Sequence, residues 1–375
     1  MSPLVHSAPS PTNTATLFPR RFVSLLRCIR DSSELILEGE LPAGEEGVTE
    51  GTLRCAGCSQ QYEIHDGIAR MMIAPQTEES GHEIALKDRE YATMPDAFEP
   101  AATGWRSEFM DRIEIPPHLR ALGPLQGRRL LELGCGDGRF TVVAAQEGAD
   151  VLAVDFAVEG LRKLAANLAR GEAPTRYRRT SRETKQDLRF RVGLVQADAG
   201  QLCVAPKSFD RALSATPLDS RDERMRMFGT VAEALNDEGL YVGGFEYDDL
   251  PRRLLGLPVA RRYSPGGILI EHLDLRKLRR ETSPYFFRTE MRLIRIHLPM
   301  IRFLPAGIGV PLALAAARIP GLREFAQIIL VRATHPIRLP KDGERRRGSA
   351  IVRNFYVWYK RALNQEAVWD KGEKV

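Results

Sequence analysis

The sequence predicts an α/β protein in which a doubly wound, mostly parallel sheet of seven strands follows a small β-rich domain. Three observations predict this fold class. Strand-like and helix-like runs alternate from about residue 117 onward, which is typical of βαβ units. A glycine-rich turn follows the first of these strands, where such sheets bind ligands. Short alternating strands with two closely spaced cysteines come before residue 75.

The alternation gives the order of the sheet. Strands are expected at residues 129–133, 150–155, 191–196, 210–215 and 239–247. Helices are expected between them at residues 140–146, 158–169 and 223–235. The second of these helices places one apolar face at helical spacing, formed by Leu161, Leu164, Ala165 and Leu168. Two later runs, at residues 285–297 and 326–334, would complete the seven strands.

Composition and pattern divide the chain into five segments. Residues 1–20 are rich in Ser, Thr and Pro and are expected to lack fixed structure. Strands at 34–38, 51–55 and 61–64 indicate the small β-rich domain, over residues 21–75. A connecting helical segment, residues 76–115, has apolar anchors at Tyr91, Phe98, Trp105 and Phe109. The large domain is expected over residues 116–336 and a basic tail over 337–375.

The overall composition is that of a soluble globular protein, with 43% hydrophobic and 27% charged residues in 375. The N-terminus lacks the pattern of a secretion signal, and five cysteines do not form a secreted disulfide framework. A cytoplasmic location is therefore expected. The most apolar segment, residues 303–317, contains two prolines and is bracketed by Arg302 and Arg318. It is too short to span a bilayer and is expected to be a core or surface element.

Charge is distributed unevenly along the chain. Residues 251–375 carry 25 Lys and Arg against 10 Asp and Glu, whereas the remainder is acidic. A basic third of this kind can face nucleic acid, a phosphorylated substrate or a membrane surface. Because no stacked aromatic platform accompanies it, we favour a solvated basic surface.

The glycine-rich turn, Gly134-Cys-Gly-Asp-Gly138, joins the first strand to a helix. Glycines let the backbone turn sharply and bring amide groups close to a ligand at a helix N-terminus. In the dinucleotide fingerprint a small third residue allows close helix packing, and here that position holds Arg139. The bulky cation argues against a dinucleotide ligand.

Residues 116–250 resemble the class I, seven-stranded S-adenosylmethionine-dependent methyltransferases. The first motif of that family, an apolar strand with an acid followed by Gly-x-Gly-x-Gly, is matched by Leu131, Glu132, Gly134, Gly136 and Gly138. The resemblance implies that the glycine turn, with Cys135 in it, passes under the methionine and ribose parts of the cofactor. It also implies that Glu132 helps to position the amino group of the cofactor.

The same resemblance assigns the ends of the next three strands to the cofactor. Asp155, with Phe156 beside it, ends the second strand, where an acid can accept hydrogen bonds from both ribose hydroxyls. Asp198 matches the position that contacts the adenine amino group, helped by the amide of Ala199. Ser214 follows the fourth strand, where cofactor and substrate usually meet. A single Asp after a strand is often only a helix cap. The evidence for a cofactor site is that these motifs occur together, in the order in which the family has them.

Two features leave the chemistry open. The Pro-Gly-Gly turn that often precedes the fifth strand of the family is replaced by residues 236–239, with a single glycine. Methyl transfer needs a general base only for some acceptors, and no motif singles one out. The catalytic residue therefore stays unassigned among Tyr247, Tyr263, His272 and Tyr285, of which His272 is the first to mutate.

A possible metal site lies near the N-terminus. Cys55 and Cys58 form a tight thiolate pair, and Cys28 and Asp31 supply a second pair upstream. Three thiolates and a carboxylate can hold zinc, but packing alone could also hold the fold after loss of the metal. His65 is a possible substitute ligand, and a surface position suits it better.

Residues 25–72 resemble the zinc-ribbon-like domain of the tRNA-methyltransferase activator family. The resemblance is carried by the ending that follows the Cys-x-x-Cys turn, at Cys58, Tyr62, Asp66, Gly67 and Ile68. In relatives fused to a methyltransferase, such a domain stabilises the enzyme or shapes its entrance.

The leading hypothesis is a methyltransferase that acts on a small molecule, such as a natural product, glycan or lipid-type acceptor. An RNA methyltransferase is the alternative, and a catalytically silent cofactor-binding or scaffold protein is the second. Peripheral membrane contact also stays open, through apolar residues between 293 and 303 that are interleaved with arginines. The same residues would serve as a buried strand, which we favour.

Overall fold

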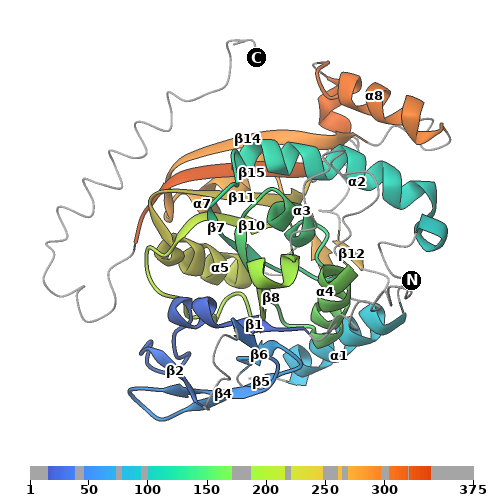
Figure 1. The fold of residues 1–375 in the computed structure, drawn as a ribbon. Helices are drawn as coiled ribbons and strands as arrows, with labels where there is room; N and C mark the ends of the chain where they lie inside the picture. The colour runs from blue at the N-terminus through green and yellow to red at the C-terminus, as the bar shows by residue number, and fades with distance from the viewer. Residues whose placement is uncertain are drawn as a thin grey trace, which may run out of the picture.

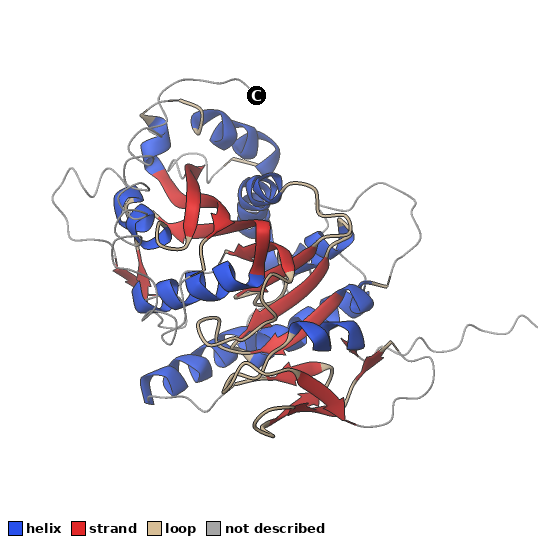
Figure 2. Cartoon of the chain, turned by 90° about the vertical axis from the view of Figure 1, so that its left-hand side faces the viewer, coloured by secondary structure: helices blue, strands red, loops and turns tan. Residues whose placement is uncertain are grey.

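The computed structural model describes residues 16–38, 46–72, 78–93, 100–170, 187–215, 221–247, 261–263, 269–296, 304–319 and 321–338. A sheet of eleven strands runs through this part of the chain, with helices on both of its faces (Figures 1 and 2), and two further sheets have two strands each. The fold is therefore mixed α/β with a large sheet, in which five strand pairings are parallel and five are antiparallel.

Short strands and one 3-10 helix make up the N-terminal part: β1 (Phe18–Pro19), η1 (Arg20–Leu25), β2 (Leu35–Glu38), β3 (Gly47–Val48), β4 (Gly51–Cys55), β5 (Gln61–His65) and β6 (Ile68–Arg70). Two long helices follow, α1 (Glu78–Thr93) and α2 (Pro100–Leu122). The expectation that residues 1–20 lack structure is wrong for Phe18, which is buried and pairs with Val48. Residues 1–15 lie outside the described part.

Strands and helices then alternate, as the sequence predicts: β7 (Arg129–Leu133), α3 (Thr141–Gln146), β8 (Asp150–Asp155), α4 (Val158–Arg170), η2 (Leu188–Arg191), β9 (Val192–Gln196), β10 (Phe209–Ser214), α5 (Arg221–Ala234) and β11 (Leu235–Glu246). The remaining elements are β12 (Arg261–Tyr263), β13 (Leu269–Glu271), α7 (Leu275–Thr282), β14 (Phe286–Ile296), α8 (Ala306–Ala316), η4 (Leu322–Phe325) and β15 (Ala326–Pro336). Of the expected basic tail, residues 339–375 lie outside the described part.

The strand order shows where the chain reverses its direction of travel across the sheet. From one edge to the other the order is β14-β15-β11-β10-β7-β8-β9-β6-β5-β4-β2. The chain runs from β7 outward through β8 to β9, and then returns to the other side of β7 with β10 and β11. The reversal lies between β7 and β10, and ligands of such sheets bind outside the carboxyl ends of the strands at this point.

The N-terminal strands continue the large sheet. β6 pairs in parallel with β9, so that Ile68 lies opposite Leu194 and Arg70 opposite Gln196. The pairing covers the edge of β9, a parallel strand that needs protection on that side. The small β-rich region and the large sheet therefore share one layer.

Two apolar cores lie on opposite faces of the sheet because side chains alternate along each strand. One core contains Leu131, Leu152 and Tyr241 together with side chains of α5 and α7. The other contains Leu130, Val151 and side chains of α2, α3 and α4. No helix in the described residues is both long and apolar enough to cross a membrane.

Helix α2 runs across the domain boundary expected from the sequence. It continues through Pro116 and Pro117, where we expected the large domain to begin, and ends at Leu122. Proline removes an N–H donor and usually interrupts a helix. In the turn before the prolines, ion pairs of Asp111 and Glu114 with Arg139 attach α2 to the turn that follows β7.

Candidate functional site

The glycine turn lies where the sheet topology places a ligand. It follows β7 directly, and the amides of Gly134 and Cys135 donate to the carbonyl of Val154 at 2.8 and 3.1 Å. Gly134, Gly136 and Gly138 all have positive φ, at 73°, 54° and 88°. Residues with a side chain rarely adopt this backbone region, so the turn requires glycines here.

Two of these glycines also allow close packing. A Cβ at Gly138 would lie 3.0 Å from Cγ of Leu164 on α4 and closer still to its Cδ1. A Cβ at Gly136 would lie 3.2 Å from Cζ of Tyr91 and closer still to its hydroxyl oxygen. Tyr91 was expected to be an apolar anchor of the connecting segment. The structure instead places it against the glycine turn.

Asp155 at the end of β8 binds the same turn. Its Oδ2 accepts the N–H of Gly136 and its Oδ1 accepts the N–H of Ala157, both at 2.8 Å. Burial raises the pKa of Asp155 to about 6, although these two backbone donors lower it. Each carboxylate oxygen has a second lone pair, so Asp155 can accept further hydrogen bonds from a ligand.

Glu132, on β7, points to the same side of the sheet. It is buried, and its Oε2 accepts a hydrogen bond from Thr141 Oγ1 at 2.6 Å. Burial raises the pKa of Glu132 to about 8, so the group is largely protonated at neutral pH. A bound ammonium group would favour the ionised form and restore the negative charge.

The remaining predicted residues lie at the carboxyl ends of neighbouring strands. Asp198 follows β9, and its Oδ1 accepts the N–H of Gly200 at 2.7 Å, so it also caps its own turn. Ala199 packs against the core on the α5 face of the sheet. The carbonyl of Phe156 accepts a hydrogen bond from Gln196 Nε2 at 3.1 Å. Ser214 is the buried last residue of β10.

Arg139, the cation that argued against a dinucleotide, belongs to a network of ion pairs. Its guanidinium lies 2.7 Å from Glu114 Oε2, and Arg295 on β14 lies 3.7 Å from the same oxygen. Arg295 also pairs with Glu246 at the end of β11, at 2.9 Å. Burial alone would raise the pKa of Glu114, but the two arginines hold it below its ordinary value. The network therefore joins α2 and the glycine turn to strands β11 and β14.

His118 is a buried polar residue near this network that sequence reasoning missed. Its Nδ1 lies 2.8 Å from the carbonyl of Glu114, and its Nε2 has no hydrogen-bond partner among the described residues. A Cβ at Gly244 on β11 would lie 2.8 Å from this Nε2 and 3.8 Å from Ala215, which follows β10. Burial lowers the pKa of His118, so its imidazole is neutral at pH 7. A lone histidine on a helix carries no sequence signal.

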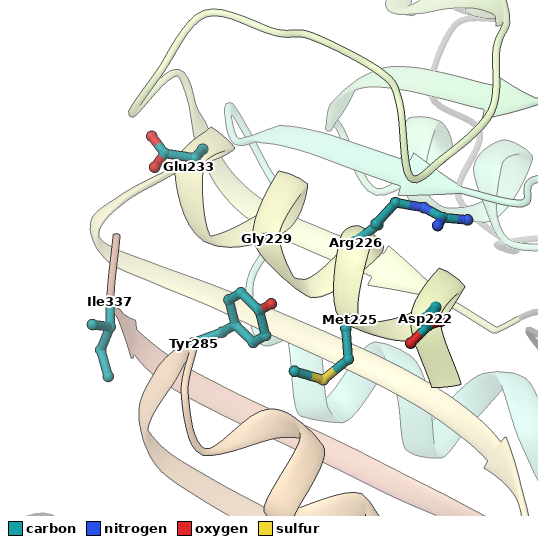
Figure 3. Close-up of a pocket in the computed structure, with 7 residues that line it drawn as sticks. All are labelled: Asp222, Met225, Arg226, Gly229, Glu233, Tyr285 and Ile337. Carbon is teal, nitrogen blue, oxygen red and sulfur yellow. The ribbon is translucent and has the colours of Figure 1, made fainter. Parts of the chain in front are cut away.

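The candidates beyond β11 do not gather at the glycine turn. His272 Nδ1 lies 3.2 Å from the carbonyl of Tyr247, which is buried. The side chain of Tyr263 lies outside the described part. Tyr285 lines a pocket of about 480 Å³ beside α5, together with Met225 (Figure 3). That pocket belongs to the α5 face of the sheet, whereas Asp155 and Glu132 occupy strand positions that face α3 and α4.

The four predicted metal ligands lie together at the other end of the sheet. One ligand atom each from Cys28, Asp31, Cys55 and Cys58 lies within 4.8 Å of every other. The sulfurs of Cys28 and Cys58 are 3.6 Å apart, and Asp31 Oδ1 lies 3.4 Å from the sulfur of Cys55. His65 is exposed and 3.0 Å from Glu50, away from this cluster.

Comparison with known proteins places a family match across the glycine turn. Residues 131–243 match the family described as the methyltransferase domain. Over 108 residues the chain is 36% identical to a ubiquinone biosynthesis O-methyltransferase of Paracidovorax citrulli, covering 28% of this chain and 39% of that enzyme. Over 54 residues it is 43% identical to phosphoethanolamine N-methyltransferase 3 of Arabidopsis thaliana, covering 14% of this chain and 11% of that enzyme. The matches thus span well under two thirds of these relatives.

Similar solved structures are more distant in sequence. An S-adenosylmethionine-dependent methyltransferase from Mesorhizobium loti is 20% identical with a TM-score of 0.38, covering 58% of this chain and 95% of that one. A 1,6-didemethyltoxoflavin-N1-methyltransferase from Burkholderia thailandensis is 13% identical with a TM-score of 0.39, covering 80% of this chain and 99% of that one.

Proposed function

We propose that this chain, whose residues 131–243 match the methyltransferase domain, is an S-adenosylmethionine-dependent methyltransferase that acts on a small-molecule acceptor. The observation that carries the proposal is the arrangement of acids around the glycine turn. Glu132 and Asp155 are buried beside it at the ends of adjacent parallel strands, and Asp155 accepts the N–H of Gly136.

The residues of the turn fit the cofactor. Gly134, Gly136 and Gly138 add no side chains of their own to the surface that a nucleoside would contact, and the Tyr91 ring beside Gly136 would border it. Asp155 would accept the ribose hydroxyls, and Asp198 would accept from the adenine amino group. Glu132 would face the amino group of the methionine part, where its buried carboxyl gains a cationic partner.

The chemistry asks the protein mainly to align two reactants. The cofactor, when bound, supplies a methyl group on a sulfonium, which transfers by in-line displacement. The chain would hold the acceptor near the carboxyl ends of β10 and β11, where Ser214, Ala215 and Gly244 lie. Ser214 and Gly244 are buried there, and we expect alignment rather than proton transfer to be the main contribution.

A small-molecule acceptor agrees with the names of the relatives, which act in ubiquinone biosynthesis or on phosphoethanolamine. The RNA alternative rests on the activator-like resemblance of the N-terminal region and on the basic C-terminal third. When labelled S-adenosylmethionine is added to a cell extract, we expect label in the small-molecule fraction. Label confined to RNA would reverse this choice. We also propose the cytoplasmic location expected from the sequence, where cysteine thiols stay reduced.

Replacing Asp155 tests the cofactor site. Asp155→Asn should weaken binding of S-adenosylhomocysteine in calorimetry by about 1–3 kcal/mol, because ribose hydroxyls lose a charged acceptor. The raised pKa adds a second signature: affinity of the unchanged chain should fall as the pH drops through about 6, where Asp155 becomes neutral. The variant should not show this fall.

The matched control is Asp150→Asn. Asp150 begins the same strand that Asp155 ends, and it pairs with Arg21 and Arg191 on the surface. Its replacement should leave affinity unchanged. Equal losses in the two variants, or no loss in either, would remove Asp155 from the site.

For the N-terminal region we propose a zinc-ribbon-like unit of the activator type that binds one zinc ion. Tetrahedral zinc with Zn–S bonds of about 2.3 Å places two sulfurs roughly 3.8 Å apart, close to the 3.6 Å between Cys28 and Cys58. The amides of Gly57 and Cys58 both point at the sulfur of Cys55, at 3.3 Å, and such donors stabilise a thiolate. Asp31 supplies the fourth ligand.

A further inference from the structure

The described part of the chain concentrates its exposed apolar side chains at one place. Seven large hydrophobic residues are exposed, and five of them lie in α8 or in the segment from α8 to the end of η4: Ile308, Leu312 and Leu314 in α8, then Ile319 and Phe325. We call these five residues the α8 patch. Figure 1 shows α8 at the outer rim of the molecule, beyond α2 and next to the end of β14.

Helix α8 is apolar on both of its sides. Val310, Ala313 and Ala316 are buried on the inner side, where α8 packs against α2 and β14. Ile308, Leu312 and Ile319 on the outer side are 55%, 47% and 49% exposed. No charged residue occurs between Pro305 and Ala317. A helix that is apolar all round normally has an apolar medium on each side.

The surrounding charge indicates which medium covers the outer side. Residues 291–322 contain no Asp or Glu. Arg292 on β14 and Arg318 just beyond α8 are exposed, whereas the side chain of Arg295 is only 9% exposed and pairs with Glu114 and Glu246. Apolar side chains bordered by positive charge are complementary to a bilayer that carries anionic headgroups. The helix has eleven residues and is too short to span a bilayer, so it would lie along the surface.

We propose that the α8 patch docks this protein on an anionic membrane surface. The site differs from the lipid-facing residues considered from the sequence. Leu293 and Ile294 belong to strand β14 and pack against the two cores, and Ile296 is buried. The proposal stands independently of the methyl-transfer activity, because the patch contains none of the cofactor-site residues.

Sedimentation with vesicles tests the proposal. The full chain should sediment with vesicles that contain phosphatidylglycerol, and less with phosphatidylcholine alone or at high salt. The double variant Ile308→Asp and Leu312→Asp should bind at least about tenfold more weakly, because two inserted apolar side chains are lost. Arg318→Glu should weaken only the salt-sensitive part.

The matched control is Ile36→Asp, which alters a side chain that is 47% exposed in the N-terminal part of the sheet. It should leave vesicle binding unchanged.

The double variant Ile308→Ser and Leu312→Ser provides the test if the aspartates impair folding. Both double variants should keep their affinity for S-adenosylhomocysteine. The proposal is overturned if the unchanged chain stays in the supernatant, or if the variants sediment like it. Conversion of an oligomer to a monomer by the variants would show that a second copy covers the patch, and would also overturn it.

Discussion

Gly138→Ala should lower the free energy of unfolding by about 2–5 kcal/mol and abolish detectable binding of S-adenosylhomocysteine. Two costs add at this position. Gly138 has φ of 88°, where a side chain costs about 1–2 kcal/mol. The new Cβ would also collide with Leu164, which is fully buried, and overpacking of a core costs about 1–3 kcal/mol. Relief of the collision must move the glycine turn, over which we expect the cofactor to lie.

Gly123→Ala separates these two costs. Gly123 has φ of 71°, but a Cβ there would meet nothing within 4 Å. Its replacement should cost only the backbone strain, about 1–2 kcal/mol, and leave binding intact. Chemical denaturation and calorimetry on both variants provide the measurement. If the two variants lose equal stability and both still bind, close packing of the turn on α4 does not matter.

Removal of zinc should have the second large effect. Structural zinc contributes about 10–16 kcal/mol of apparent binding free energy in zinc-finger peptides. Here sheet pairing also holds β4 to β2 and β5, so we expect a smaller loss, on the order of 5 kcal/mol, for the N-terminal region. Cys58→Ser should lose the metal, measured by mass spectrometry, and expose residues 46–65 to hydrogen exchange.

Cys203→Ser is the control for that experiment. Cys203 is partly buried outside the cluster, so its replacement should retain one zinc per chain. The zinc proposal is contradicted if the unchanged chain is purified without metal and takes up no zinc under reducing conditions, and if its exchange protection equals that of Cys58→Ser. Packing alone would then hold the strands.

The sequence predicts the strands of the large sheet well for a physical reason. A parallel strand covered on both faces is a short apolar run, and β7 and β8 begin and end at the residues expected. Helix α4 shows its buried face through Leu161, Leu164 and Leu168. Local patterns of this kind need no knowledge of distant partners.

Other features depend on partners that no local pattern shows. The pairing of β6 with β9 joins residues more than 120 positions apart, and Ile68–Arg70 is too short to signal its neighbour. Helix α2 continues through Pro116, although proline normally ends a helix. An ion pair between Glu114 of this helix and Arg139, which lies after β7, holds the helix there. His118 is noticed as a possible site residue only in the structure, because its Nε2 lies beside Gly244 on β11, a strand far along the chain.

A crystal structure with S-adenosylhomocysteine tests the central claim most directly. We expect the ribose hydroxyls within hydrogen-bonding distance of Asp155 and the nucleoside over Gly134–Gly138. Density for the ligand in the pocket between α5 and Tyr285 (Figure 3), or an empty glycine turn at saturating concentration, would contradict the account.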